Sequence, residues 1–125
     1  MALPAADAVL APVTAIDGFQ LAGLIDASTG MVLASARERD DISLPMAAAG
    51  ATDIASILGL LSGELATGDE LEDVMVTYDQ HFHLLRVVRA APTQSVILLV
   101  ILDRSRANLA IARRAIRIFC ASLAA

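Results

Sequence analysis

The amino-acid sequence predicts an α+β domain in which an antiparallel sheet carries helices on both faces. Five segments are rich in β-forming residues, and the short connections within each group of strands favour antiparallel pairing. One segment, VILLVIL from Val96 to Leu102, is apolar at every position. This pattern is typical of a central strand covered on both faces. Helical patterns precede the first strand, separate the second from the third, and follow the fifth.

The N-terminal third of the chain predicts a short helix and a β-hairpin. The helix is expected over residues 7–16, with Pro12 interrupting it. Two strands, Phe19–Asp26 and Met31–Ala36, flank the turn sequence ASTG. Gly30 can supply the positive φ that such a tight turn requires.

A long helix is expected from Leu44 to Ala66, with Ser43 as its N-cap. At about 100° per residue its large apolar side chains form one stripe, which we expect to face the core. This stripe comprises Met46, Ile54, Ile57, Leu58, Leu61 and Leu65, with Leu60 at its margin.

The opposite side of this helix carries small side chains and no charge, where a solvated helix would carry Glu, Lys or Arg. These small residues are Ala48, Ala51, Thr52, Ala55, Gly59, Ser62 and Ala66. We expect the small side to contact a partner chain, because small side chains allow close approach. The alternative explanation is compositional, because alanine is abundant throughout the chain and is the best helix former.

The second half of the chain predicts three strands and a closing helix. The strands are expected at Leu71–Tyr78, His81–Ala90 and residues 95–102, with Asp79-Gln80 as the first turn. The closing pattern, SRANLAIARRAIRIFCASLA, is amphipathic. Its apolar face comprises Leu109, Ala112, Ile116, Phe119 and Leu123.

Composition restricts the classes of function. At 125 residues the chain is long enough for a single domain, which we expect over residues 1–125. The formal net charge of -5 argues against a nucleic-acid or anionic-lipid partner. The run from Val96 to Leu102 is too short to cross a membrane, and the N-terminal segment lacks a basic signal-peptide region. We therefore expect a cytoplasmic protein without direct membrane insertion.

Several groups of residues are candidate chemical sites. His81 and His83 share a strand face, but two histidines leave a zinc site incomplete, so we expect no metal or other cofactor. The acidic run Asp69, Glu70, Glu72 and Asp73 has no identifiable acid-base partner. DASTG lacks the glycine spacing and lysine of a P-loop, and Cys120 is expected to be a buried, reduced thiol. We expect no catalytic site, and therefore no enzyme.

Arg113, Arg114 and Arg117 in the closing helix allow two interpretations. They can bind an acidic partner, or they can complement the negative end of the helix dipole. The second interpretation is preferred from the sequence.

Four stretches together resemble the roadblock family, the dynein-light-chain-type domain that also occurs as small stand-alone bacterial proteins. They are GLIDASTGMVLAS, the long helix of small and apolar residues, LEDVMVTYDQHFHLLRVV, and VILLVILDRSRANLAIARRAI. The resemblance covers residues 7–120. It implies a roadblock/profilin-like order α-β-β-α-β-β-β-α, with the long helix on one face of a five-stranded antiparallel sheet and the terminal helices on the other.

The resemblance also implies a homodimer in which the long helices meet and strand Leu71–Tyr78 pairs with its symmetry mate. The dimer interface would then comprise Ala48, Ala51, Thr52, Ala55, Gly59, Ser62, Val74 and Val76. Bacterial members of the family are associated with Ras-like small GTPases as activators or scaffolds. Asp53 and Glu64 are the candidate GTPase contacts, because acidic side chains can steer a basic partner. The long helix has no arginine to act as a catalytic finger.

The leading hypothesis is a non-enzymatic homodimeric interaction module that regulates or scaffolds a small GTPase. The alternative is a small-molecule sensor domain of the PAS or GAF type, which also covers a sheet with helices. A sensor needs a cavity, and the chain offers few aromatic residues to line one. A metal-dependent enzyme using His81 and His83 is the third hypothesis.

Overall fold

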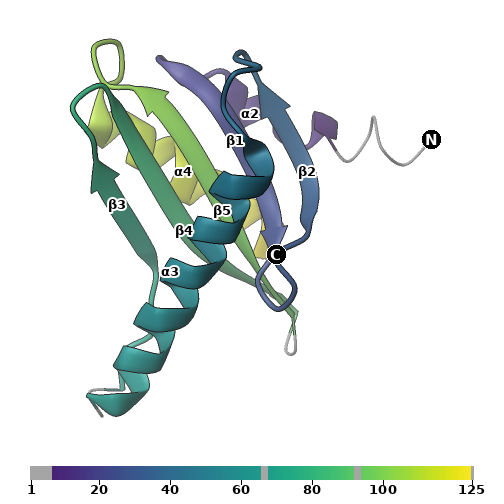
Figure 1. Ribbon diagram of the computed structural model, residues 1–125, viewed down its shortest axis with the longest axis vertical. Helices are drawn as coiled ribbons and strands as arrows, with labels where there is room; N and C mark the ends of the chain where they lie inside the picture. The colour runs from purple at the N-terminus through teal and green to yellow at the C-terminus, as the bar shows by residue number, and fades with distance from the viewer. Residues whose placement is uncertain (1–6, 66–67, 92–93, 125) are drawn as a thin grey trace.

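The computed structural model describes residues 7–65, 68–91 and 94–124 (Figure 1). Two helices and five strands follow the expected order, and a short helix precedes them. The elements are α2 Ala11–Thr14, β1 Phe19–Asp26, β2 Val32–Arg37, α3 Leu44–Glu64, β3 Asp73–Thr77, β4 His81–Ala91, β5 Gln94–Asp103 and α4 Leu109–Ala124.

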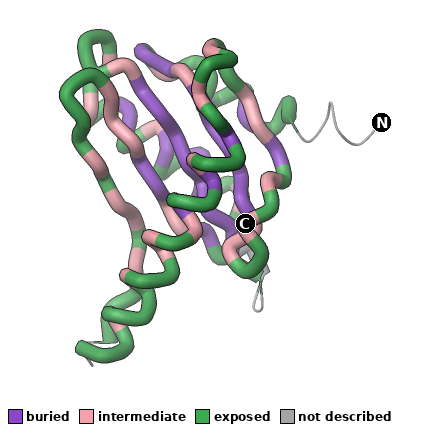
Figure 2. The backbone as a smooth tube through the Cα atoms, in the orientation of Figure 1, coloured by how far each residue is buried: buried purple, intermediate pink, exposed green. Residues whose placement is uncertain are grey.

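The five strands form one antiparallel sheet in the order β2-β1-β5-β4-β3. Strand β5 lies at the centre, and every residue from Val96 to Leu102 is buried. This confirms the expectation of a central strand covered on both faces. In Figure 2 the buried backbone is concentrated in the middle strands of the sheet.

The helices cover both faces of the sheet, as expected. Helix α3 lies on one face, and α2 and α4 lie on the other (Figure 1). The α4 side has the larger core, in which Phe119, Ile116 and Ala112 of α4 meet side chains of β1, β4 and β5. The α3 side has a smaller core, centred on Leu21, Ile25, Leu85, Ile97, Leu99 and Ile101.

Local signals account for most element boundaries. Gly30 has a φ of 77° in the turn between β1 and β2, as expected. The Asp26 carboxylate accepts hydrogen bonds from the backbone N–H and the hydroxyl of Ser28, which lower the pKa of Asp26. Helix α4 begins at Leu109, later than the sequence pattern suggested, because Asn108 accepts a hydrogen bond from the N–H of Ile111 as an N-cap.

The N-terminal helix is shorter than expected. The prediction was one helix over residues 7–16, whereas α2 spans only Ala11–Thr14. Pro12 lies in its first turn, the position at which a proline is tolerated. The Asp7 carboxylate accepts a hydrogen bond from the N–H of Ser35 in β2 at 3.0 Å, so it satisfies a backbone donor of the edge strand.

The predicted orientation of α3 is wrong. Ala48 and Ala51, expected at a dimer interface, are 1% and 3% exposed and pack on the sheet. Met46 and Ile57, expected in the core, are 74% and 66% exposed. The sheet contributes leucine and isoleucine side chains to this core. Because these side chains are large, the helix packs on them through its small residues.

Candidate interaction surface on α3 and β3

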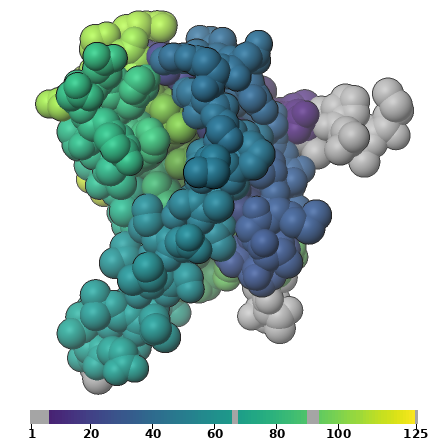
Figure 3. Space-filling model, viewed as in Figure 1, coloured from purple at the N-terminus to yellow at the C-terminus, as the bar shows by residue number. Residues whose placement is uncertain are grey.

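Only the first half of α3 is anchored to the sheet. Its three buried residues, Leu44, Ala48 and Ala51, all lie in the first two turns. Only 17% of the most apolar 18-residue stretch of α3 is buried. The second half extends beyond the edge of the sheet and stands out from the body of the molecule (Figures 1 and 3).

Helix α3 is also the one helix, among the described residues, that is long and apolar enough to cross a membrane by length and composition. Core helices of soluble proteins meet the same two criteria. Ser43 caps its N-terminus by accepting a hydrogen bond from the N–H of Met46.

Large apolar side chains are exposed along α3. Ile57, Leu60, Leu61 and Leu65 are 66%, 72%, 47% and 61% exposed. One exposed apolar side chain is ordinary, but several adjacent ones on a helix mark an interaction surface. The helical pattern predicted Ile57, Leu61 and Leu65 in the core, with Leu60 at the margin of the stripe.

The apolar flank of α3 is directed toward the β3 side of the sheet. Ala47, which lies seven residues before Ile54 and so on the same flank, lines a hollow with His83 of β4, the strand next to β3. Residues three, four, seven and eleven positions further on share the flank of Ile54, because the helix repeats every 3.6 residues. We call this set the apolar flank, and it comprises Ile54, Ile57, Leu58, Leu61 and Leu65.

Small residues from Thr52 onward in α3 line a cleft, and of these Ala55 also packs against the core on the sheet. This cleft has a volume of about 720 Å³ and lies between α3, the ends of the strands and the segment after α3. The four predicted interface residues Thr52, Ala55, Gly59 and Ser62 line it, together with Val87. The hydroxyls of Thr52 and Ser62 donate to the carbonyls of Ala48 and Leu58 within the helix.

The remaining predicted interface residues lie on β3. Val74 and Val76 are half-buried, and Val74 contacts the core under α3. Strand β3 forms one edge of the sheet, with β4 as its single neighbour. Among the described residues, no side chain hydrogen-bonds to the backbone of Asp73–Thr77. The backbone groups on the outer side of β3 are therefore available for another strand.

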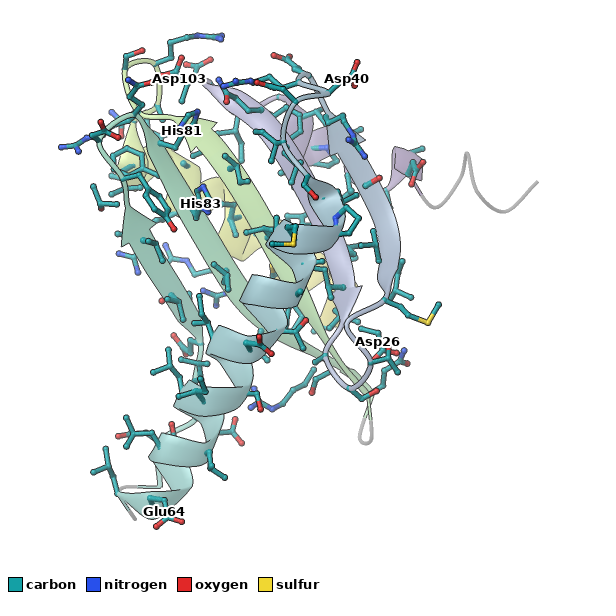
Figure 4. The ribbon with its side chains drawn as sticks, in the orientation of Figure 1. Asp26, Asp40, Glu64, His81, His83 and Asp103 are labelled. Atoms are coloured by element: carbon teal, nitrogen blue, oxygen red, sulfur yellow. The ribbon has the colours of Figure 1, made fainter. Side chains whose placement is uncertain are left out.

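Asp53 and Glu64, the predicted GTPase contacts, are both exposed. They are eleven residues apart, which places them on one side of the helix, together with Leu60. Glu64 lies near the far end of α3 in Figure 4. These carboxylates mark the outward side of the helix, and their position is the sequence signal that indicates the true orientation of α3.

His81 and His83 lie on β4, near the start of α3 (Figure 4). The Nε2 atom of His81 is 3.0 Å from Oε1 of Gln20, which also accepts a hydrogen bond from Arg39 at 3.2 Å. His83 packs against the ring of Tyr78, with 4.7 Å between ring centroids. The described residues contain no group of three or more His, Cys, Asp or Glu placed to hold a metal ion.

The other candidate groups have structural contacts. Glu70 lies 3.8 Å from Arg89. Asp73 lies 3.7 Å from Arg86 and 3.1 Å from Arg113, so it pairs with arginines and not with another carboxylate. Burial of Cys120 raises the pKa of its thiol to about 11, which keeps it protonated near neutral pH.

No protein-family model matches the sequence, and no curated protein matches it. The fold resembles several solved structures. MglB from Myxococcus xanthus gives a TM-score of 0.81 at 20% identity, covering 98% of this chain and 86% of that one. An MglB described as having a tetrameric arrangement gives 0.80 at 19% identity, covering 98% and 87%.

A Roadblock/LC7 domain from Streptomyces avermitilis gives a TM-score of 0.76 at 19% identity, covering 94% of this chain and 92% of that one. Identities this low establish the fold but do not transfer residue roles. The strand order, the antiparallel pairing and the placement of helices agree with the fold that the sequence resemblance implied. The chain therefore has the roadblock/LC7 fold.

Proposed function

We propose that this chain is a non-enzymatic interaction module that forms a homodimer through α3 and β3, and that the dimer binds a Ras-like small GTPase. The observation that carries the proposal is the apolar flank of α3 beside an open edge strand. Ile57 and Leu65 are 66% and 61% exposed in the single chain. Pairing β3 with its symmetry mate would extend the sheet beneath the overhanging half of α3 and cover this flank.

The dimer proposed here differs from the one expected from sequence. Ala48 and Ala51 hold α3 on its own sheet, so they are unavailable to a second chain. The contact is instead assigned to the apolar flank and to the outer edge of β3. A two-fold arrangement suits such a surface, because each chain supplies one helix and one strand edge. The apolar composition of α3 is then explained by protein contacts without membrane insertion.

The GTPase partner rests on the resemblance to the roadblock family, which is a fold-level analogy. The outward side of α3, with Asp53, Leu60 and Glu64, is the surface assigned to it. Paired copies of this surface would lie on one side of the dimer. The proposal includes a cytoplasmic location, where Ras-like GTPases act, and no catalytic residue from this chain.

The dimer is tested with two isoleucines of equal exposure. Ile57 on α3 and Ile111 on α4 are each 66% exposed. Ile57→Glu is expected to sediment as a monomer at micromolar concentration, because the dimer would bury an unpaired carboxylate. Ile111→Glu is the matched control and is expected to remain a dimer. A monomeric wild type in analytical ultracentrifugation would contradict the proposal.

GTPase binding is tested by calorimetric titration of the dimer with Ras-like GTPases from the same genome, loaded with GDP or a GTP analogue. Asp53→Lys/Glu64→Lys is expected to weaken binding and slow association, because charges at a contact rim act mainly on the association rate. Asp17→Lys/Glu38→Lys changes two exposed carboxylates elsewhere and should bind as wild type. Absence of binding in both nucleotide states would refute the GTPase assignment and leave the dimer untouched.

A small-molecule sensor is the second candidate, and the cleft beneath α3 is the observation that favours it. Its volume of about 720 Å³ lies within the range of ligand sites. In the proposed dimer the cleft borders the contact between chains. A ligand that raises the melting temperature of Ile57→Glu as much as that of wild type would support a sensor that needs no dimer.

A further inference from the structure

The outer face of α4 lies on the opposite side of the sheet from α3 and carries a distinct surface. Ile111 and Ile118, two turns apart, are 66% and 59% exposed. Arg114 is exposed between them along the helix. The buried face of α4 comprises Ala112, Ile116, Phe119 and Cys120. At about 100° per residue, Arg114 lies opposite this buried face, with the isoleucines on one side of it and Arg113 and Arg117 on the other.

The arginines border a pocket between α4 and the edge of the sheet. The pocket has a volume of about 210 Å³ and is lined by Asp73, Arg86, Ala110, Arg113, Arg114 and Arg117. It holds four of the nine arginines in a chain whose net charge is -5. The group of four arginines and one carboxylate carries a formal charge of +3.

Asp73 positions part of this cluster. Its Oδ2 accepts a hydrogen bond from Arg113 at 3.1 Å and lies 3.7 Å from Arg86. Within residues 7–65, 68–91 and 94–124, no carboxylate forms a salt bridge with Arg114 or Arg117. Two guanidinium groups therefore remain for an external acidic group, beside two that an internal carboxylate holds in place.

The helix-dipole interpretation of these arginines is wrong. Helix α4 spans Leu109–Ala124, and its last turn contains no basic residue. Arg113, Arg114 and Arg117 are the fifth, sixth and ninth of its 16 residues, in the second and third turns, whereas the dipole acts on charges within the terminal turns. They therefore gain nothing from the dipole, and Arg113 pairs instead with Asp73.

We propose that the outer face of α4 is a docking site for an acidic amphipathic segment of a partner protein. The isoleucines contact apolar side chains of the segment, and Arg114 and Arg117 bind its carboxylates bidentately. The complementary sequence is apolar–acidic–apolar at helical spacing. The site lies on the opposite face of the sheet from α3, to which GTPase binding is assigned, and through Asp73 its arginine pocket borders β3, the strand of the proposed dimer contact.

An acidic peptide fits better than two other occupants. A membrane surface fits less well, because α4 exposes only two large apolar side chains and its other apolar face is buried. A second copy of α4 would place like-charged arginines against each other. Carboxylates of a partner segment complement the charges of Arg114 and Arg117, and its apolar side chains can match the two-turn spacing of the isoleucines.

The test uses a short fluorescein-labelled helical peptide with two leucines two turns apart and glutamates between them. Fluorescence anisotropy at low salt should show binding to the wild-type dimer that weakens as salt rises. Arg114→Glu/Arg117→Glu is expected to bind at least about tenfold more weakly, which corresponds to about 1.4 kcal/mol. Arg37→Glu/Arg106→Glu is the charge-matched control on other exposed arginines and should bind as wild type.

Three binding results would overturn the docking site. They are no binding of the peptide, whether or not phosphatidylserine vesicles bind, equal binding of its Glu→Gln counterpart, and equal binding by the double variant. Sedimentation of the double variant separates this proposal from the dimer proposal. An unchanged dimer is expected, whereas a monomer would assign α4 to the contact between chains and also overturn the docking site.

Discussion

The ionisation of His83 is coupled to folding near neutral pH, because burial disfavours its charged form. His83 is half-buried on β4 beside the ring of Tyr78. Burial lowers its pKa below the ordinary value of 6.5, and the charge of nearby His81 adds to the effect. The folded chain therefore binds the His83 proton less readily than the unfolded chain does.

We predict that the stability of the fold decreases as the pH falls below about 6.5, the ordinary histidine value. Above this pH, His83 is neutral in both the folded and the unfolded chain, so its ionisation does not affect the free energy of unfolding. Below this pH, the unfolded chain binds the proton before the folded chain does, which lowers the free energy of unfolding. This decrease is complete once the pH is below the pKa of His83 in the folded chain. Urea unfolding between pH 8 and 5 measures this decrease. His83→Gln should show a smaller decrease, and an unchanged one would contradict the assignment.

At the scale of the elements, the sequence predicted the type and order of the strands and of the two long helices. Strand β1 matches its predicted bounds, and β4 and β5 differ from theirs by one or two residues. Their signals are local, because turn glycines and continuous apolar runs act within a few residues. The face that α3 presents to the sheet is not local, because it depends on the size of side chains on strands far away in the sequence.

The candidate site was predicted only in part for the same reason. The sequence predicted a helix with one large apolar side and one small uncharged side, and the family resemblance named α3 and β3 as the elements of the proposed interface. It did not show which side meets the sheet, since that requires the large residues of β5 opposite Ala48 and Ala51. Asp53 and Glu64 carried the missing information, because charged side chains mark the solvent side of a helix.

Gly59 and Gly50 of α3 are a matched pair for testing how closely a second chain approaches the helix. A Cβ on either glycine meets no atom within 4 Å in the single chain. Gly→Ala at each position should therefore stabilise the helix by about 0.5–1 kcal/mol. Gly59 borders the cleft beside the proposed contact, so Gly59→Ala should also weaken dimerisation if a partner backbone approaches closely. Gly50→Ala should not. Urea denaturation and sedimentation separate the two effects, and equal dimer affinity would remove Gly59 from the interface.

For the whole molecule, the long helices on the two faces of the sheet differ in charge. Helix α3 carries exposed leucines and isoleucines with two carboxylates and no arginine, and α4 carries exposed isoleucines with three arginines and no carboxylate. In the single chain, the second half of α3 contributes no fully buried residue to the core. An isolated helical segment of this length is marginal in water, and in our proposal the second chain of the dimer stabilises it.

The second half of α3 should show whether a second chain stabilises it. The backbone amides of residues 54–64 should exchange quickly with solvent in the monomer and slowly in the proposed dimer, because in our proposal dimerisation buries this segment. Amides of β5 should remain protected in both, since its residues Val96–Leu102 are buried within one chain.

Hydrogen exchange measured by mass spectrometry on wild type and on Ile57→Glu compares the two states. The monomeric variant is expected to lose protection in this segment and to retain it in β5. Equal protection of the segment would mean that α3 is stable without a partner, and the exposed apolar flank would then require an explanation other than dimerisation.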